Sequence, residues 1–110
     1  MLQLKERHRQ IIQNILSRYP YNFYAYGSRV KGNARLLSDL DLCYYDNILS
    51  SVICKMREEF AQSNLPFMVE LVNWKNMRPA FQKSIEKDLI LVSVPIFQDL
   101  KKSTPKVKNS

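Results

Sequence analysis

Residues 27–42 contain the side chains of this 110-residue chain whose types and spacing most clearly suggest chemistry. Gly27 and Ser28 end an aromatic run, and Asp39 and Asp41 follow after a short basic stretch. Gly27 lets the backbone turn sharply and approach a ligand closely. Ser28 offers a hydroxyl and is predicted to cap a short helix through about Asn33. Because the free N–H groups at the start of a helix bind phosphate, we expect a phosphate-binding turn here.

The two aspartates are expected on one face of a strand, because side chains two residues apart on a strand point the same way. Their Cα atoms would then lie roughly 6.6 Å apart. Carboxylates at this spacing repel each other. A divalent cation removes that penalty, and Mg²⁺ is usually held by one or two carboxylates together with substrate phosphates. The ordered combination of turn and carboxylates predicts a metal-dependent enzyme that acts on a nucleoside triphosphate.

Three basic residues and a third carboxylate extend this candidate site. Arg29, Lys31 and Arg35 either contact phosphate, which we favour, or form a solvated basic face. Glu70 stands in the apolar run 67–72, where an acid is costly to bury without partners. We predict that Glu70 is a ligand of a second metal ion and a base toward an attacking hydroxyl. The alternative is an edge-strand glutamate that faces solvent.

Hydrophobic spacing predicts the elements that must position these residues. Apolar residues at helical spacing predict helices over 3–18, over about 49–60 and from Pro79 onward. Alternation and aromatic content predict strands over 22–26, 39–45 and 67–72. The run 89–92 either continues the last helix or forms a closing strand. Helices and strands that alternate in this way predict one small α/β domain.

Composition and charge limit the class of protein further. Seventeen basic residues against ten acidic ones give a net charge of +7, which attracts triphosphates, RNA or an acidic partner. No apolar run is long enough to span a membrane, and the N-terminus is too charged for a signal peptide, so we expect a cytoplasmic protein. Cys43 and Cys54 are expected to be reduced thiols, and zinc is not expected. The domain is predicted to cover residues 1–98, and residues 99–110 to form a basic, disordered tail.

The same motif carries a resemblance to a known family. Gly27-Ser28 followed by Asp39-Leu40-Asp41-Leu42 resembles the active-site signature of the DNA polymerase β-like nucleotidyltransferase superfamily. The fuller strings 27–35, 38–42 and 66–74 are similar to its minimal nucleotidyltransferase (MNT) branch, over roughly residues 5–92. The resemblance implies an α/β (α+β) fold, with a small mixed sheet flanked by helices.

The resemblance also implies roles for individual residues. Asp39, Asp41 and Glu70 would be catalytic and would bind metal, with two Mg²⁺ ions expected. The nucleotide-binding set would comprise Gly27, Ser28, Arg29, Lys31, Arg35 and Ser38. The branch commonly has Asp at the third acidic position, whereas this chain has the longer Glu70. The spacing of the metal ions or the choice of acceptor can therefore differ from the branch.

The activity implied by the resemblance is transfer of AMP from ATP, with release of pyrophosphate. Many members of the branch are antitoxins encoded beside a HEPN-domain ribonuclease toxin, and they are thought to silence it by adenylylating a toxin tyrosine. The chain is therefore expected to be a protein adenylyltransferase and an antitoxin with a HEPN-type partner. Two alternatives stay open: an antitoxin that acts by binding alone, and an RNA-directed nucleotidyltransferase. We expect RNA as a partner less than protein, since no dedicated nucleic-acid-binding motif is present.

Overall fold

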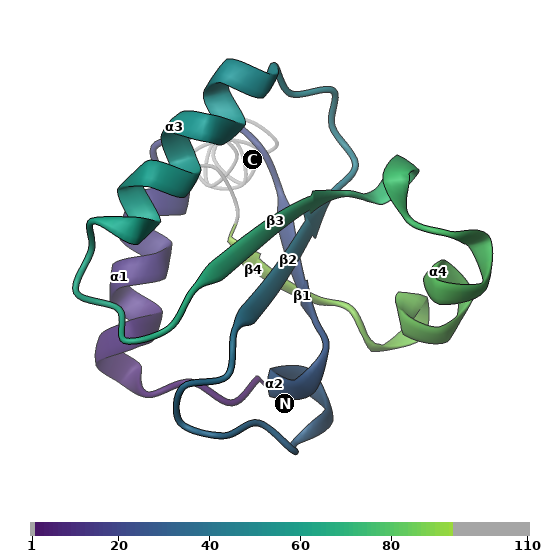
Figure 1. Cartoon of the computed structure of the whole chain (residues 1–110), viewed down its shortest axis with the longest axis horizontal. Helices are drawn as coiled ribbons and strands as arrows, with labels where there is room; N and C mark the ends of the chain where they lie inside the picture. Colours follow the sequence, from purple (N-terminus) through teal and green to yellow (C-terminus); the bar gives the residue numbers. More distant parts are fainter. Residues whose placement is uncertain (1, 94–110) are drawn as a thin grey trace, which may run out of the picture.

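A four-stranded mixed sheet forms the centre of the molecule, and helices cover both of its faces (Figure 1). The computed structural model describes residues 2–93. The helices are α1 (Glu6–Leu16), α2 (Ser28–Lys31), α3 (Ser50–Ala61) and α4 (Pro79–Ile85), with 3₁₀ turns η1 (Trp74–Asn76) and η2 (Glu86–Asp88). The strands are β1 (Phe23–Tyr26), β2 (Leu40–Tyr44), β3 (Val69–Asn73) and β4 (Ile90–Ser93). This architecture confirms the predicted α/β (α+β) fold with a small mixed sheet.

The strand order β3-β2-β1-β4 follows from how the strands are connected. β1 pairs antiparallel with both β2 and β4. β2 pairs parallel with β3, and a parallel pair needs a long crossover, which α3 supplies. The order places β1 and β2 in the middle of the sheet. The turn after β1 and the carboxylates around β2 therefore adjoin strands that are paired on both sides.

The alternation predicted for the strands separates two hydrophobic clusters. On one face, β1, β2 and β3 pack against α1 and α3, which lie side by side in Figure 1. Leu40, Leu42 and Tyr44 of β2 all point into this larger cluster. On the other face, a smaller cluster joins the sheet to the α4 region and contains Tyr26, Cys43, Met77 and Ile85. Asp41 alternates with Leu40 and Leu42, so it lies on the α4 side of the sheet.

The segment after α4 resolves an alternative that the sequence left open. α4 ends at Ile85, η2 follows, and Ile90–Ser93 forms β4. β4 pairs with β1, placing Leu91 opposite Tyr24 and Ile90 opposite Ala25. The run 89–92 therefore contributes a closing strand instead of continuing the helix. The predicted domain boundary after residue 98 and the basic tail lie outside the described residues.

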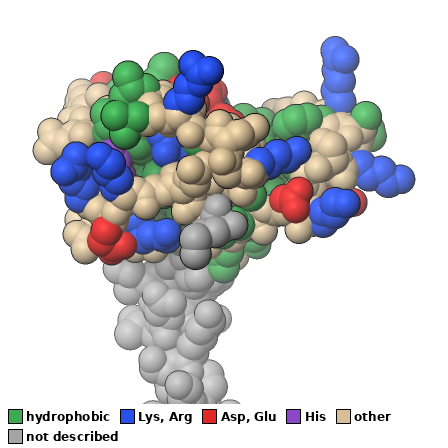
Figure 2. All heavy atoms as spheres, turned by 90° about the horizontal axis from the view of Figure 1, so that it is seen from below, with side chains coloured by type: hydrophobic (Ala, Val, Ile, Leu, Met, Phe, Trp, Pro, Cys, Tyr) green, Lys and Arg blue, Asp and Glu red, His purple; other side chains and the backbone are tan. Residues whose placement is uncertain are grey.

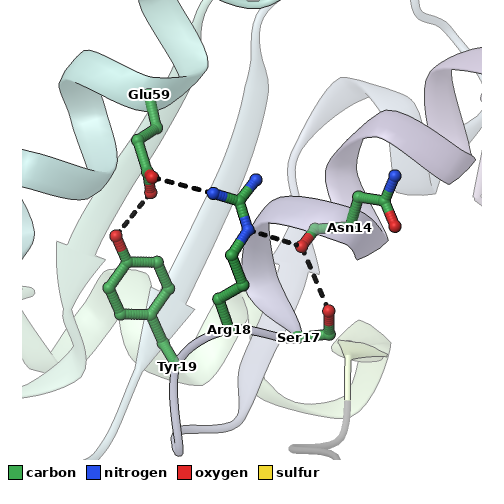
Figure 3. Close-up of polar contacts among 5 residues, drawn as sticks. All are labelled: Asn14, Ser17, Arg18, Tyr19 and Glu59. Atoms are coloured by element: carbon green, nitrogen blue, oxygen red, sulfur yellow. Dashed lines mark hydrogen bonds and ion pairs between the residues drawn. The ribbon is translucent and has the colours of Figure 1, made fainter.

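A polar contact fastens the end of α1 to α3 (Figure 3). Arg18 forms an ion pair of 3.0 Å with Glu59 of α3, and the hydroxyl of Tyr19 donates to the same carboxylate. Burial raises the pKa of Tyr19 to about 12, and the contact with Glu59 adds to this shift. The phenol is therefore a stable hydrogen-bond donor at neutral pH.

Across residues 2–93, no helix combines the length and the apolar character that crossing a membrane requires.

Candidate functional site

Tyr26, Asp41 and Glu70 form a row across β1, β2 and β3, and Gly27 lies at the end of β1 beside this row. The register pairs Tyr26 with Asp41 between β1 and β2, and Asp41 with Glu70 between β2 and β3. Directly paired residues point to the same face of a sheet, so the two carboxylates share the α4 side. Gly27 follows β1 immediately, and a Cβ built on it would lie only 2.6 Å from Asp41 Oδ2. The predicted turn and the predicted strand carboxylate are therefore direct neighbours in space.

The backbone of Gly27 explains why a glycine stands at this turn. Its φ of 89° and ψ of −155° lie in a region that is essentially confined to glycine. Gly27 is the N-cap residue of α2, and its carbonyl accepts hydrogen bonds from Val30 and Lys31. Ser28 is the first residue inside the helix, so the prediction that Ser28 caps it is wrong. No side chain makes a capping hydrogen bond at the start of α2. The first N–H groups of α2 have no hydrogen-bond partner within the helix.

Asp39 lies one residue before β2, in the loop that leads into the strand, and it is exposed, so the prediction that Asp39 and Asp41 share one strand is wrong for Asp39. Its charge nevertheless reaches Asp41. Burial raises the pKa of Asp41, and the charges of Asp39 and Glu70 raise it further. The three carboxylates predicted from the sequence therefore form one electrostatic group, in which Asp41 is the more buried member beside the exposed Asp39 and Glu70.

The same carboxylates provide the donor chemistry that a divalent cation prefers. Within residues 2–93, however, no three His, Cys, Asp or Glu side chains come together as a metal-binding group. Asp39 is placed by the loop before β2 and Glu70 by the edge strand β3, so each approaches Asp41 from a different element. Mg²⁺ is usually held by one or two carboxylates and completes its coordination with phosphate oxygens and water. The donor set therefore fits such an ion, and the three-ligand arrangement stays a prediction.

The position of Arg29 differs from the one expected for a phosphate ligand. Only 6% of it is exposed, and its guanidinium donates four hydrogen bonds to the carbonyl oxygens of Gln3, Leu36 and Ser38. It also lies over the ring of Phe67, with 4.1 Å between Cζ and the ring centroid. Because the guanidinium is occupied by main-chain oxygens, phosphate contact by Arg29 does not fit the structure. We attribute to it a role within the protein.

The other predicted nucleotide-binding residues lie near the start of β2 and the end of α2. Lys31 and Arg35 are exposed, as a phosphate contact or a solvated basic face both require. The hydroxyl of Ser38 accepts a hydrogen bond of 2.8 Å from the N–H of Arg35, so it shapes the loop. Figure 2 views the molecule from the α2 end and shows Lys and Arg side chains spread over this face without a single continuous patch.

Tyr26 is a site neighbour that the sequence did not single out. It is 7% exposed and stands opposite Asp41 in the β1–β2 pairing. Burial raises its pKa to about 12, and the charge of Asp41 adds to the shift. The aromatic run before Gly27 was visible in the sequence, but the antiparallel register that places this ring beside Asp41 was not. Cys43, two residues after Asp41, is a buried filler of the same cluster.

A cavity of about 540 Å³ opens at the β3 edge on the α3 side of the sheet, and Asp41 does not line it. Asp39 and Glu70 line it, and so does Arg57 of α3. Its remaining walls are apolar: Leu37, Phe60, Ala61, Leu65, Pro66, Phe67, Met68 and Val69. The side chains of Leu37 and Met68 are 63% and 65% exposed. The site therefore has a polar side at the Gly27 turn and an apolar side at the β3 edge.

Comparison with known proteins agrees with this geometry. Residues 10–94 match the family model described as polymerase beta, nucleotidyltransferase. A protein of Haemophilus influenzae named probable protein adenylyltransferase MntA is 32% identical over 95 residues, which cover 83% of each chain. A crystal structure described as a toxin-antitoxin with AMP-PNP has the same fold, with a TM-score of 0.60 and 16% identity over 91% of this chain and 84% of that one. This chain is thus an enzyme of the polymerase β nucleotidyltransferase family.

Proposed function

We propose that the chain is an Mg²⁺-dependent protein adenylyltransferase that transfers AMP from ATP to a hydroxyl of a partner protein and acts as an antitoxin. The observation that carries the proposal is the position of Asp41, which lies against the glycine-only turn at Gly27, stands opposite Glu70 and is influenced by the charges of Asp39 and Glu70. The relative named a protein adenylyltransferase supports a protein acceptor. The toxin-antitoxin structure with AMP-PNP supports an ATP-like nucleotide and a toxin partner.

The residues of this chain would divide the reaction as follows. Gly27 and Ser28 would hold the triphosphate through the turn and the first N–H groups of α2. Asp39 and Asp41 would hold Mg²⁺, which when bound neutralises the charge on the phosphates. Glu70 would accept the proton of the acceptor hydroxyl. The hydroxyl oxygen then bonds to the α-phosphorus, while the bond from that phosphorus to the oxygen of the departing pyrophosphate breaks.

The cavity beside Asp39 and Glu70 provides space for the acceptor in this proposal. Because attacking and leaving oxygens lie roughly in line, the acceptor should approach from the side opposite the triphosphate. The Gly27 turn lies on one side of Asp41, and Glu70 lies on the other. The cavity begins beyond Glu70, at the β3 edge, and extends toward α3. We propose a tyrosine of a HEPN-type toxin as the acceptor and a cytoplasmic location for the reaction.

One observation favours a second candidate function. The carboxylates of residues 2–93 are not assembled as a three-ligand metal site. An antitoxin that neutralises its partner by contact alone needs no such site. RNA-directed transfer is supported by the net charge of +7. The Lys and Arg side chains in Figure 2 are separated from one another, so this face provides less support for RNA binding. The three functions differ in what receives AMP: a partner protein, RNA or, for neutralisation by binding alone, no molecule.

The test is a transfer assay with ATP labelled at the α-phosphate. The protein, the protein encoded beside it and an RNA sample are incubated with Mg²⁺, and label is followed on each acceptor. The Asp39→Asn/Asp41→Asn variant should transfer no label. The variant Asp46→Asn/Glu58→Gln is the matched control, because it removes two exposed carboxylates that line neither the cavity nor the turn. Label on the neighbour protein supports the proposal. Equal neutralisation of the neighbour by wild type and by the Asp39/Asp41 variant, without label, refutes it.

A further inference from the structure

The buried guanidinium of Arg29 lies at the junction of three segments that surround the site. Its Nε and one NH₂ group donate to the carbonyl of Ser38 at 3.0 and 2.8 Å. The same NH₂ group donates to the carbonyl of Leu36 at 3.0 Å. Ser38 directly precedes Asp39, so two carbonyls of the loop that carries this carboxylate are bound to one side chain. Within residues 2–93, no strand pairs with the loop before Leu40 begins β2.

The N-terminal segment completes the enclosure of Arg29. The second NH₂ group of Arg29 donates to the carbonyl of Gln3 at 2.8 Å, and the N–H of Gln3 donates back to the carbonyl of Arg29 at 2.7 Å. The side-chain oxygen of Gln3 accepts from the N–H of Ala34 at 3.1 Å. The N-terminal segment, α2 and the loop are thus linked through one residue.

An aromatic ring supports the guanidinium from the β3 side. Arg29 lies over Phe67, which is three residues before Glu70 in sequence. His8 of α1 contacts the same ring edge-on, with 5.5 Å between the ring centroids. Burial lowers the pKa of His8, and nearby positive charges, including Arg29, lower it further, so the imidazole stays neutral at pH 7. Arg29 is therefore held against a fixed aromatic surface and does not swing into the phosphate site.

We propose that Arg29 is a positioning residue, which fixes the loop of residues 34–39 and so determines where the Asp39 carboxylate lies relative to Asp41 and Glu70. Its consequence for catalysis rests on the proposed function. An arginine suits this role because its planar guanidinium has five donors in a fixed fork and can stack on a ring at the same time. A lysine at this position has three donors on one nitrogen and no planar group, so it cannot reproduce the four hydrogen bonds of the guanidinium together with its stacking on Phe67.

The test compares Arg29→Lys with wild type by amide hydrogen exchange and by transfer kinetics. Arg29→Lys should accelerate exchange in residues 34–39 by about tenfold, the change expected from losing one or two hydrogen bonds. Exchange in residues 40–44 should change much less, because the sheet pairing of β2 is untouched. The Mg²⁺ concentration for half-maximal transfer should rise several-fold, while the KM for the acceptor protein stays the same.

Two further variants make the result decisive. Arg78→Lys is the matched control: it makes the same chemical change at an exposed residue at the start of α4 and should alter neither readout. Gln3→Ala removes the acceptor of the Ala34 N–H but none of the bonds of Arg29, so it should accelerate exchange at Ala34 and leave Ser38 unchanged. It also provides a milder perturbation if Arg29→Lys does not fold.

The possible outcomes separate this inference from the proposed function. Uniform acceleration of exchange throughout Arg29→Lys, or no acceleration in residues 34–39, would overturn the positioning role. The role is also overturned if Gln3→Ala loosens the loop around Ser38 as much as Arg29→Lys does, because the N-terminal segment would then hold the loop. Selective loosening of residues 34–39 in a protein whose wild type transfers no label supports the positioning role and overturns the proposed function alone.

Discussion

Replacing Gly27 with alanine tests whether the turn and the Asp41 carboxylate compete for one space. The φ and ψ of Gly27 lie in a region where another residue costs about 1–3 kcal/mol. The new Cβ would lie 2.6 Å from Asp41 Oδ2, so the carboxylate must move. Moving a side chain away from its preferred rotamer costs about 0.5–1.5 kcal/mol. We expect Gly27→Ala to lower the free energy of unfolding by about 1.5–4.5 kcal/mol in total.

Gly32→Ala is the matched control for this substitution. Gly32 also has a positive φ, 87°, with ψ of 9°, where a non-glycine residue costs roughly 1–2 kcal/mol. A Cβ on Gly32 would meet no atom within 4 Å. Both variants therefore pay for backbone strain, and the additional loss in Gly27→Ala reports the contact with Asp41.

The assay is urea unfolding followed by circular dichroism, with thermal unfolding as a second measurement. For a domain of this size, the loss expected for Gly27→Ala corresponds to a fall in Tm of roughly 6–36 °C. Adding Asp41→Ala to each glycine variant completes a double-mutant cycle. The penalty of Gly27→Ala should shrink by about 0.5–1.5 kcal/mol in the Asp41→Ala background, and that of Gly32→Ala should not change. Equal penalties for the two glycine variants, with no coupling to Asp41, would refute the reasoning.

Three further predictions concern titration, helix contact and thiol reactivity. Asp41→Asn should raise the free energy of unfolding at neutral pH, because burial and neighbouring charges raise the folded-state pKa of Asp41 above its ordinary 3.8. In urea titrations this gain should disappear below pH 3.8, where the carboxyl is protonated in both the folded and the unfolded state. Glu59→Gln should lower the free energy of unfolding by about 1 kcal/mol in thermal unfolding, a modest value because Arg18 is largely exposed. A thiol reagent at pH 8 should label the exposed Cys54 quickly and Cys43 only after unfolding, since burial raises the pKa of Cys43 to about 11.

Each of these has a contradicting result. A gain from Asp41→Asn that persists at pH 3 would show that the carboxylate charge is not its cause. If high salt leaves the loss in Glu59→Gln unchanged, the exposed ion pair with Arg18 does not contribute to it. Rapid labelling of both thiols in the folded protein would contradict the burial of Cys43.

The spacing of apolar residues predicted most of the helices and strands, because the buried face of each element requires apolar residues at that spacing. The alternation of β2 was confirmed, with Leu40, Leu42 and Tyr44 in the larger cluster and Cys43 in the smaller one. The helices expected over 3–18 and about 49–60 appear as α1 and α3 with ends shifted by a few residues. The run 89–92 could not be assigned, because a short apolar run suits a helix and a strand equally. Only the free edge of β1 decides that it becomes β4.

For the candidate site, too, the sequence determined one part and the tertiary structure another. Residue types and spacing alone pointed to a phosphate-binding turn, a carboxylate pair and Glu70, because binding a triphosphate and a metal ion requires groups of those types. Tertiary structure decided which of them meet. The antiparallel β1–β2 pairing brings Gly27 against Asp41, and the parallel β2–β3 pairing puts Glu70 opposite it. It also removed Arg29 from the predicted phosphate contacts. Strand register and the burial of a charge depend on contacts between distant segments, which no local pattern of residues records.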